Sequence, residues 1–457
     1  MIALITLFIT GIITLFIAFL RKPILVGIVA SIGLIGAFAG LLYEYKSGII
    51  LFSDYAGLDF NVTAVLFSSV SIIFTLLLIW SGFKPLTENK EHAGDHIALL
   101  LFSLCGALIM TAFTDFFMFF LGLEILSIPV YVLAGMKKDD SLGSEASLKY
   151  FLTGAFSTGV LLFGIAWIYG ATGSFSMFEI LNAVLNNPPS SLLYVGILLV
   201  LASFLFKIGA VPYHFWSPDV YSGSPMTIMG YMSTVIKIAG FAALLRLFTE
   251  TFAPAIEMWQ PIIIVVSILS MFVGNLSAIK QTRMRRLLAF SSIAHVGYTL
   301  LAVISFDTQA SGLYYYNIYY YLFAYALATI IIVTIGNAIN DDEDLIENWT
   351  GVGRKNPFIG FFVIVAFLSL AGVPPLMGFF GKYLVFTQAI GEYPIVVGLA
   401  LLNSGIAIYY YLSVIIKALK KPAVETSEKL NISILQWVVM AFCVIVLLIG
   451  GFVLPLA

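Results

Sequence analysis

The sequence predicts an all-α polytopic membrane protein with 14 transmembrane helices, organised as two inverted five-helix repeats with broken helices 7 and 12. Three observations lead to this prediction. Hydrophobic residues make up 61% of the 457 residues and charged residues only 10%, whereas a soluble domain carries about 25% charge. Long apolar stretches recur along the whole chain. Two of these stretches combine a lysine, glycines and a proline break in opposite order.

The composition also excludes several classes of function. The net charge is −2 and the basic residues are scattered, so we expect no nucleic-acid partner. Cys105 and Cys443 lie in apolar stretches more than 300 positions apart, which predicts neither a disulfide framework nor a metal site. The first apolar stretch is followed, not preceded, by basic residues (Arg21 and Lys22), which is the wrong polarity for a secretory signal. We therefore expect an uncleaved first span.

Fourteen stretches are apolar enough to span a bilayer, which takes roughly 20 residues of helix. They lie at about 2–20, 24–43, 62–83, 96–114, 116–135, 150–172, 191–212, 225–248, 255–278, 286–305, 311–338, 357–387, 395–416 and 433–456. The connections between them are short and leave no room for a globular domain. The stretches 311–338 and 357–387 are overlong, which indicates tilt or interruption of the helix.

The basic residues predict the orientation of the spans, because Lys and Arg are in excess in cytoplasmic loops. Of the 22 Lys and Arg residues, 17 lie in the alternate loops at 21–23, 84–95, 136–149, 213–224, 279–286, 339–356 and 417–432. The loops on the other side hold only Lys46 and Arg246, and three lysines lie within spans. We therefore expect these basic loops in the cytoplasm and both termini on the outer side.

Two spans carry the same features in reversed order, which predicts an inverted repeat. The seventh reads Lys207 and then Pro212, whereas the twelfth reads Pro374-Pro375 and then Lys382. Because five spans separate them, they cross the membrane in opposite directions, as the broken helices of inverted repeats do around a midplane ion site. The predicted parts are three N-terminal helices (1–95), a first five-helix repeat (96–249), a second repeat (250–421) and a C-terminal helix (422–457).

Four charged residues lie inside predicted spans, where a charge costs roughly 2.5–3.5 kcal/mol and therefore indicates function. They are Glu124, Lys207, Lys237 and Lys382. The alternative for the lysines is snorkelling toward the headgroups, which is least expected for Lys237 at mid-span. The alternative for Glu124 is a static ion pair. A Glu124–Lys207 pair would keep both groups charged, and its separation would favour proton release from Lys207, as a proton relay requires.

Other polar residues are weaker candidates. His295 lies about ten residues into the tenth span, near Ser291 and Ser292, and is either a hydrogen-bonded core residue or a proton shuttle. We expect His214 to be a loop residue near an interface. We expect Asp115, at the outer edge of the fifth span, to reach water.

Three further patterns favour structural roles. The run LYYYNIYYYLFAYAL (313–327) is typical of an aromatic belt, although Tyr325 lies too deep for a belt and is a candidate member of a polar axis. The acidic run DDEDLIE (341–347) is interpreted as a solvated cytoplasmic loop, with partner docking as the alternative. Gly36 and Gly40 form a GxxxG pair, which indicates close helix packing.

The sequence lacks the motifs that bind common cofactors. It contains no GxGxxG motif, no P-loop and no cluster of Cys or His. We therefore expect no nucleotide, flavin, iron–sulfur or haem site in this chain, and any ion movement would be driven from outside it.

Six segments together resemble the subunit N family of bacterial respiratory complex I (NADH:quinone oxidoreductase), one of its antiporter-like membrane subunits. They are FLGLEILSIPVYVLAG (120–135), EASLKYFLTGAFSTG (145–159), FKIGAVPYHFWSPDVYSGSP (206–225), STVIKIAGF (233–241), QTRMRRLLAFSSIAHVGY (281–298) and LSLAGVPPLMGFFGKYLVF (368–386). Any one segment would be only suggestive, whereas the combination is specific. The fourteen-span layout extends the resemblance over nearly the whole chain.

The resemblance implies a role for each matching residue. Glu124 and Lys207 fall on the family's Glu–Lys pair, in its fifth helix and its broken seventh helix. Lys237 falls on the central lysine of the eighth helix. Lys382 falls on the charged residue of the broken twelfth helix, nearest the exit, and His295 on the tenth-helix histidine. In the family these groups form a hydrated polar axis, and the resemblance implies the same proton relay here.

The resemblance also implies the setting of the chain. It implies proton translocation coupled to quinone reduction elsewhere in a complex, with other membrane subunits on both sides, in the bacterial inner membrane. NADH, FMN, iron–sulfur clusters and quinone would then bind to other subunits of the complex, and none of them to this chain.

Two departures and two alternatives accompany the resemblance. Family sequences often read PDVYEG where this chain reads PDVYSG, with Ser222 in place of the glutamate. Many also carry proline where this chain has Ile236. The resemblance therefore does not predict the local geometry at these two positions. The first alternative is a subunit of an Mrp-type cation/proton antiporter, which shares the Glu–Lys pair and broken helices. Lys382 favours subunit N, because subunit M and one Mrp subunit carry Glu there. The second alternative is a structural subunit with a static polar core.

Overall fold

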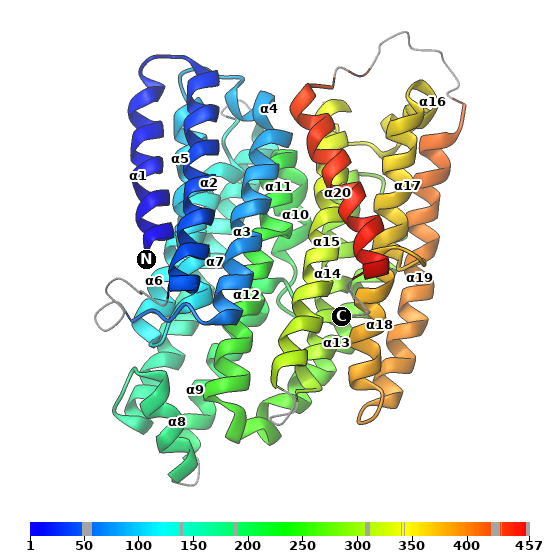
Figure 1. Cartoon of the computed structure of the whole chain (residues 1–457). Helices are drawn as coiled ribbons and strands as arrows, with labels where there is room; N and C mark the ends of the chain where they lie inside the picture. The colour runs from blue at the N-terminus through cyan, green and yellow to red at the C-terminus, as the bar shows by residue number, and fades with distance from the viewer. Residues whose placement is uncertain are drawn as a thin grey trace. The chain divides into compact units, whose positions relative to one another are not determined.

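The structure, a computed structural model, describes residues 1–47, 57–137, 140–186, 190–306, 311–339, 341, 343–421, 430 and 432–453. The end of the last predicted span (454–456), Asp342 and parts of the predicted basic loops at 136–149 and 417–432 lie outside these ranges. Within the ranges, the regular structure is helical (Figure 1), and three isolated β-bridges are the only strand-like pairing. The predicted all-α class is therefore confirmed.

Twelve helical stretches of the described residues are long and apolar enough to span a membrane. Two predicted stretches give shorter helices. The first is α1 (Ile2–Ala18), with 17 residues. The predicted stretch 357–387 is divided into α17 (Pro357–Ala371) and α18 (Met377–Ala389), which confirms that it is interrupted. The chain is a multi-pass membrane protein, and the number of fourteen spans stays a prediction.

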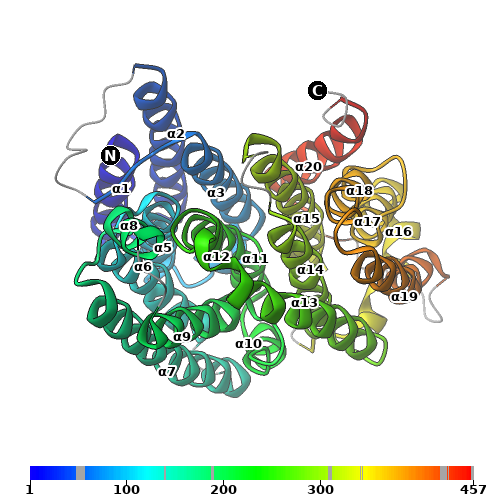
Figure 2. The same ribbon diagram turned by 90° about the horizontal axis from the view of Figure 1, so that it is seen from below.

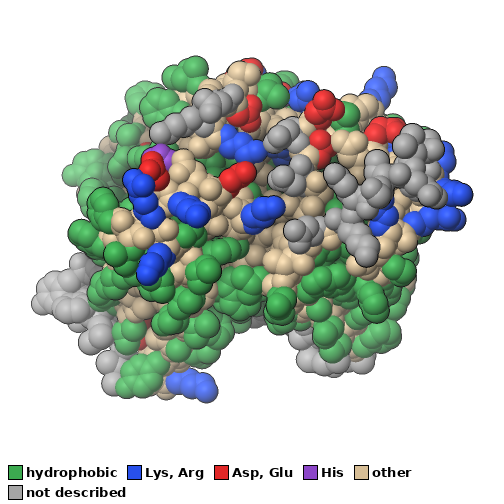
Figure 3. Space-filling model, turned by 90° about the horizontal axis from the view of Figure 1, so that it is seen from above, with side chains coloured by type: hydrophobic (Ala, Val, Ile, Leu, Met, Phe, Trp, Pro, Cys, Tyr) green, Lys and Arg blue, Asp and Glu red, His purple; other side chains and the backbone are tan. Residues whose placement is uncertain are grey.

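Charged side chains gather at the ends of the helices, whereas the flanks are hydrophobic. Figure 3 looks onto one set of these ends and shows Lys, Arg, Asp and Glu side chains there, above flanks covered by apolar side chains. Polar ends and apolar flanks are the distribution that a bilayer imposes, because charges are costly in its hydrocarbon core.

The chain divides into two compact units. The first contains Met1–Ile79, Phe83–Gly209 and Gly223–Ile263, and the second contains Trp80–Gly82, Ala210–Ser222 and Ile264–Ala457. The short segments that change unit are the end of α3 (Val62–Ser81) and the connection that follows α9 (Ser191–Ile208).

The first unit is built mainly from helices that pack on neighbours close in sequence. Helices α5 and α6 pack together extensively, as do α7 and α9, and α1 packs on both α2 and α5. The view along the helices in Figure 2 shows α12 beside α5 and α9, which it contacts. The remaining elements of this unit are α2 (Pro23–Ser47), α4 (Phe83–Thr87), α5 (Ala93–Ala112), α6 (Phe116–Ala134), α7 (Ser141–Thr172), α8 (Met177–Asn186), α11 (Met226–Ser233), α12 (Val235–Leu245), the π-helix η1 (Arg246–Thr251) and the 3₁₀ helix η2 (Ala253–Ala255).

Glycines allow the helices of the first unit to approach closely. A Cβ atom on Gly106 of α5 would lie 2.2 Å from the backbone nitrogen of Leu126 on α6. A Cβ atom on Gly196 of α9 would lie 2.9 Å from the carbonyl oxygen of Gly164 on α7. The facing backbones therefore leave no room for a side chain, and small residues at helix contacts serve this purpose in membrane proteins.

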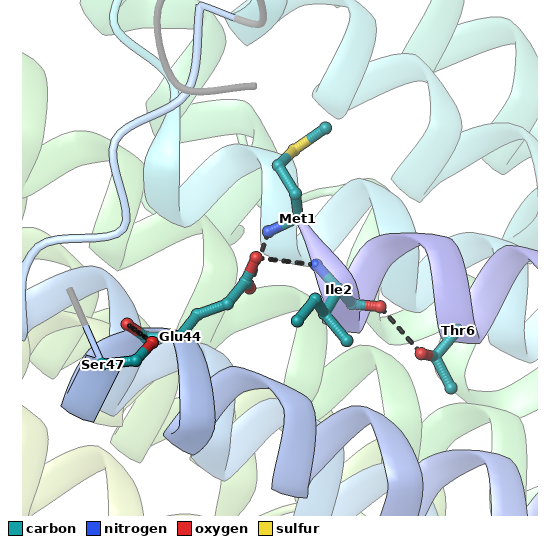
Figure 4. Close-up of polar contacts among 5 residues, drawn as sticks. All are labelled: Met1, Ile2, Thr6, Glu44 and Ser47. Atoms are coloured by element: carbon teal, nitrogen blue, oxygen red, sulfur yellow. Dashed lines mark hydrogen bonds and ion pairs between the residues drawn. The ribbon is translucent and has the colours of Figure 1, made fainter. Parts of the chain in front are cut away.

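A buried carboxylate fixes the first two helices to each other (Figure 4). The Glu44 carboxylate, near the end of α2, accepts hydrogen bonds from the nitrogens of Met1 (2.8 Å) and Ile2 (3.0 Å). The first N–H groups of a helix have no partner within it, so Glu44 supplies acceptors at the start of α1, where the helix dipole also favours an anion. The packing predicted from Gly36 and Gly40 is confirmed at Gly40, where a Cβ atom would lie 2.6 Å from Ile2.

The second unit surrounds α14 (Met284–Ile304), which is buried over most of its length. This helix contacts α15, α18 and α19, and α15 also contacts α17, α18 and α20. The other elements that contribute to this unit are α10 (Trp216–Gly223), α13 (Ile256–Ala278), α15 (Ser311–Ile339), the 3₁₀ helix η3 (Ile346–Trp349), α16 (Val352–Lys355), α19 (Pro394–Leu419) and α20 (Ile434–Val453).

Two helices end at a glycine in the left-handed region, at the positions where the sequence predicts breaks. Helix α9 ends before Gly209 (φ 73°), and α17 ends before Gly372 (φ 80°). Glycine adopts this conformation without steric cost and commonly terminates helices. Both predicted breaks, in spans 7 and 12, are therefore present.

Gly106→Ala tests the close packing of α5 on α6. The added methyl group would push against the α6 backbone, so we expect a loss of about 1–3 kcal/mol in the free energy of unfolding, measured as a lower Tm in detergent. Gly159→Ala on α7 is the matched control, because a Cβ atom there has nothing within 4 Å. Equal Tm values for the two variants would contradict the packing described here.

Candidate functional site

Glu124 lies in the middle of α6, where a neighbouring helix supplies a hydrogen bond. The helix starts after Asp115, whose carboxylate accepts a hydrogen bond from the Met118 backbone nitrogen (2.8 Å). Asp115 therefore caps the helix and is partly exposed, as predicted. The Glu124 carboxylate accepts a hydrogen bond from the Thr158 hydroxyl of α7 (2.7 Å) and is half-buried.

Lys207, in the last turn of α9, is joined to the helix that carries Glu124. Its ammonium donates a hydrogen bond to the Ser127 hydroxyl, and this hydroxyl donates to the Leu123 carbonyl of the same helix. Among the described residues, no direct ion pair joins Glu124 to Lys207, although the carboxylate acts electrostatically on the ammonium. Glu124 and Lys207, the predicted Glu–Lys pair, therefore do not contact each other directly. Lys207 instead contacts Ser127, which lies one turn after Glu124 on α6.

Lys237 lies just after an irregularity in its helix. Thr234, between α11 and α12, departs from helical geometry (ψ −79°), and the hydroxyls of Ser233 and Thr234 both donate to the Gly230 carbonyl (3.0 and 2.7 Å). Hydroxyl groups that bond back to the helix in this way bend it. Lys237 thus occupies the first turn of α12, in a span that is buried throughout.

Lys382 satisfies a backbone group that the broken helix leaves without a partner. Its ammonium donates hydrogen bonds to the Ala371 carbonyl (3.0 Å) and the Ser404 hydroxyl (2.9 Å). It also lies 4.9 Å from the centroid of the Tyr298 ring, within the range of a cation–π interaction. Ala371 is the last residue of α17, where carbonyls lack partners within the helix, so the break supplies an oxygen for the charge.

The three lysines are enclosed by the described structure. Lys207 is 5% exposed, Lys237 4% and Lys382 4%. None of these side chains reaches the molecular surface, so snorkelling does not account for them. Burial of a charged group requires polar partners, and for Lys207 and Lys382 these are the hydroxyl and carbonyl oxygens named above.

His295 of α14 is held between two tyrosines. Its Nδ1 atom lies 2.6 Å from the Tyr321 hydroxyl, and its Nε2 atom lies 3.1 Å from the Tyr411 hydroxyl. The Tyr411 hydroxyl also lies 2.5 Å from the Ser291 hydroxyl. In a neutral imidazole one nitrogen donates and the other accepts, so the two tyrosines allow His295 to receive a proton on one side and release it on the other.

Further tyrosines extend this polar group within the second unit. Tyr325 donates a hydrogen bond to the Ser292 hydroxyl (2.8 Å), and its ring lies 4.8 Å from the His295 ring. Tyr325 therefore lies in the polar group around His295, and its membership of a functional polar axis stays a prediction. The Tyr298 ring lies 5.9 Å from His295 and faces Lys382, so it connects the histidine to the lysine.

Two buried asparagines belong to the same group and are absent from the predictions. The Asn275 amide donates to the Tyr298 hydroxyl (3.1 Å) and to Asn403, and its oxygen accepts from Tyr410 (3.0 Å). An asparagine within an apolar stretch is itself a signal, because an amide buried without partners is costly. Tyr411 carried no such signal, because a tyrosine in a span is ordinary.

Three residues differ from their predicted surroundings. Arg246 belongs to the π-helix η1 rather than to a loop, and its buried guanidinium donates to the carbonyls of Asp59 and Thr111 and pairs with the Asp59 carboxylate (3.6 Å). Arg246 lies two residues before the predicted end of the span at 248, in the π-helix that extends to Thr251. His214 lies in the turn between α9 and α10, as predicted for a loop residue, but its side chain is buried. Ser222 is buried, and its hydroxyl has no hydrogen-bond partner among the described residues.

The acidic run is partly folded onto the start of α14 and is not a solvated loop throughout. The buried Asp344 carboxylate accepts a hydrogen bond from the Arg285 backbone nitrogen (2.7 Å) and pairs with its guanidinium (3.2 Å). The Asp344 carbonyl accepts from the Met284 nitrogen (2.8 Å). These contacts supply acceptors to the first N–H groups of α14 and so help to place His295.

Within the described ranges, no group of three or more His, Cys, Asp or Glu side chains is arranged to hold a metal ion. The candidate site consists of a half-buried carboxylate and of buried ammonium, imidazole and hydroxyl groups, whose chemistry allows them to bind protons.

Comparison with known proteins relates this arrangement to one family. The family model described as NADH:quinone oxidoreductase/Mrp antiporter, TM matches residues 114–407. NADH-quinone oxidoreductase subunit N of Cytophaga hutchinsonii is 38% identical over 403 residues, which cover 88% of this chain and 87% of that protein.

Solved structures agree with this relation. A chain of respiratory complex I from Thermus thermophilus is 32% identical, with a TM-score of 0.83 over 99% of this chain and 98% of that chain. A chain of the Mrp complex from Dietzia sp. DQ12-45-1b has a TM-score of 0.81 over 100% of this chain and 96% of that chain, at 18% identity. The second likeness is one of fold alone.

Asp344→Asn tests the electrostatics at the start of α14. Burial raises the pKa of Asp344, and Arg285 opposes the rise without cancelling it. The folded chain therefore holds this proton more tightly than the unfolded chain, and the contribution of Asp344 to stability falls as pH rises through its folded-state pKa. We therefore expect the Tm of Asp344→Asn, relative to the Tm of the parent protein, to increase between about pH 4 and pH 7.

The measurement is thermal unfolding in detergent across this pH range. Glu145→Gln, which changes an exposed carboxylate, is the control. If the Tm of Asp344→Asn instead decreases relative to that of the parent as pH rises, the ion pair of Asp344 with Arg285 outweighs the cost of burying the carboxylate.

Proposed function

The chain belongs to the subunit N family of NADH-quinone oxidoreductases, and we propose that it is a proton-translocating membrane-arm subunit of a respiratory complex of this kind. The observation that carries the proposal is a set of ionisable groups in apolar helices, of which the three lysines and His295 are buried and Glu124 is half-buried. Glu124, Lys207 and Lys237 lie in the first unit, and His295 and Lys382 lie in the second. Charges at this depth are costly and mark ion pathways.

In the first unit, the proton is held or released according to the state of the Glu–Lys pair. The Glu124 carboxylate favours a protonated Lys207, because an anion nearby stabilises an ammonium. A change in the electrostatics of the membrane arm, driven by quinone reduction elsewhere in the complex, weakens this influence. Lys207 then gives up its proton toward Lys237. The Ser127 hydroxyl, which touches Lys207 and lies one turn from Glu124, is where the two charges communicate.

In the second unit, the proton leaves by way of Lys382. His295 accepts and releases a proton through its two nitrogens, which face the Tyr321 and Tyr411 hydroxyls. Lys382 holds a proton against the Ala371 carbonyl and releases it when the neighbouring charge changes. We assign Glu124, Lys207, Lys237, Lys382 and His295 as the relay residues.

The rest of the proposal concerns the setting of the chain. The two inverted repeats comprise 96–249 and 250–421, preceded by three helices (1–95) and followed by one (422–457). The chain lies in the bacterial inner membrane with both termini outside and other membrane subunits on either side. NADH, FMN, iron–sulfur clusters and quinone bind to other subunits, and the chain contributes to the enzyme as a non-redox subunit.

An Mrp-type antiporter is less well supported. The relative from Cytophaga hutchinsonii is 38% identical and named as subunit N, whereas the likeness to the Dietzia Mrp complex is at 18% identity. A static structural subunit would gain nothing from three enclosed lysines, because apolar packing stabilises helices without the cost of burying charge.

Purification of the native particle separates the two transport assignments. If the chain belongs to a respiratory NADH:quinone oxidoreductase, an affinity-tagged copy will co-purify with flavin and iron–sulfur absorbance and with NADH oxidation by quinone. An Mrp assembly has neither property. A particle with Na⁺/H⁺ exchange and no redox chromophore would overturn the proposal.

Lys237→Ala tests the relay within the assembled complex. Without the ammonium, the relay in the first unit is interrupted, so we expect proton pumping in proteoliposomes to fall by at least about tenfold, with quinone reductase activity reduced alongside. Lys149→Ala is the control, because Lys149 is exposed and pairs with Glu145 (2.6 Å) one turn away on the same helix. Unchanged pumping and reductase rates in Lys237→Ala would refute the relay, and a loss of assembly alone would favour a structural role.

A further inference from the structure

Helix α10, which follows the break after α9, carries three buried hydroxyl groups without hydrogen-bond partners among the described residues. They belong to Ser217 (1% exposed), Tyr221 (0%) and Ser222 (8%). A buried hydroxyl without a partner destabilises the fold, because it has lost its hydrogen bonds to water. Such groups are exceptional in folded proteins and require an explanation.

The three groups lie on one short helix, which favours a shared ligand over three separate defects. Ordered water meets this need, because one buried molecule typically makes about three hydrogen bonds to otherwise unsatisfied polar groups. A hydroxyl both donates and accepts, so it suits water. An anion or a metal ion would require charged partners, and none of the three side chains is charged.

This hydroxyl cluster adjoins α14, the helix that carries His295. The hydroxyls of Ser292 on α14 and Ser217 lie beside the Tyr221 phenol, without reaching the geometry of a direct hydrogen bond. Ser292 accepts a hydrogen bond from Tyr325 (2.8 Å), whose ring lies 4.8 Å from His295.

The outer end of the cluster is marked by an exposed ion pair. Asp219 of α10 pairs with Arg286 in the first turn of α14 (2.9 Å), and both side chains are 39% exposed. From Arg286 to His295 the helix rises by about 13 Å at 1.5 Å per residue. Ser292 lies between them on the same helix. The hydroxyl cluster and Ser292 thus belong to the two helices that carry the exposed ion pair.

We infer that Ser217, Tyr221 and Ser222 bind a chain of ordered water molecules that carries protons from the surface at Asp219–Arg286 to His295. A proton that reaches one side of a hydroxyl oxygen is matched by release of the hydroxyl proton on the other side. Each residue therefore ends the transfer with its original composition, and the net change is one proton gained by His295. The inference deepens the proposed function and rests on it.

Tyr221→Phe tests the role of the chain of water in the assembled complex. It keeps the ring and removes the oxygen, so we expect proton pumping in proteoliposomes to fall by at least about tenfold. Tyr320→Phe is the matched control: this tyrosine is also buried in the second unit, but its hydroxyl donates to the Gly450 carbonyl (2.9 Å), away from the cluster. We expect the control to pump within about twofold of the parent.

A second measurement detects the ordered water molecules directly. A cryo-EM map of the intact complex, at a resolution that shows water, should contain ordered density against the three hydroxyls, and Ser217→Ala/Ser222→Ala should lose part of it. The wild-type map decides the matter even if Tyr221→Phe fails to assemble. A dry cluster would overturn the inference.

The two proposals fail in different ways. If Lys237→Ala abolishes pumping and Tyr221→Phe does not, the water chain is wrong and the proposed function stands. If neither variant changes pumping, the relay itself is wrong.

Discussion

A lysine ammonium stays inside a membrane protein only where protein atoms replace its water, and this requirement governs the arrangement of both units. Without such atoms, burial of the charge would cost far more than a folded chain can tolerate. Lys382 meets the requirement with a carbonyl, a hydroxyl and an aromatic face from Ala371, Ser404 and Tyr298. The carbonyl is available because α17 ends at Gly372. The helix break and Lys382 therefore depend on each other. The carbonyl freed by the break accepts a hydrogen bond from the ammonium, and the ammonium gives that carbonyl a partner.

The break in the first unit solves the same problem with different partners. Lys207 precedes Gly209, and its ammonium turns to Ser127 on a neighbouring helix. Because Ser127 follows Glu124 by one turn, the carboxylate acts on the lysine without direct contact. A direct ion pair would hold the proton tightly, whereas a hydroxyl between the charges leaves the ammonium able to exchange. The close approach of α5 and α6 at Gly106 holds α6 in the position that this contact requires.

The residues that carry charge could be predicted from the sequence, and most of their partners could not. A charged residue within an apolar stretch can be recognised from the sequence alone, which is how Glu124, Lys207, Lys237 and Lys382 were predicted. Hydroxyl and amide partners come from other helices, and tyrosine or serine is common in any span. Tyr411 and Asn403 on α19 reach the α14 group only through packing across more than 100 residues of chain. Helix irregularities are equally hidden, since nothing in the sequence announces the bend at Thr234.

The same limit explains the misplaced residues and the form of the site. Arg246 is buried in a π-helix, where the carbonyls of Asp59 and Thr111 accept its hydrogen bonds, and hydropathy measures composition rather than such contacts. Charged groups are costly in a membrane, so the chain uses few of them, at points where a proton is held. Hydroxyls cost less to bury and both donate and accept, which suits them to the steps between. The clusters around His295 and on α10 are built from such neutral groups, so a proton can pass through them without any of their members becoming a new buried charge.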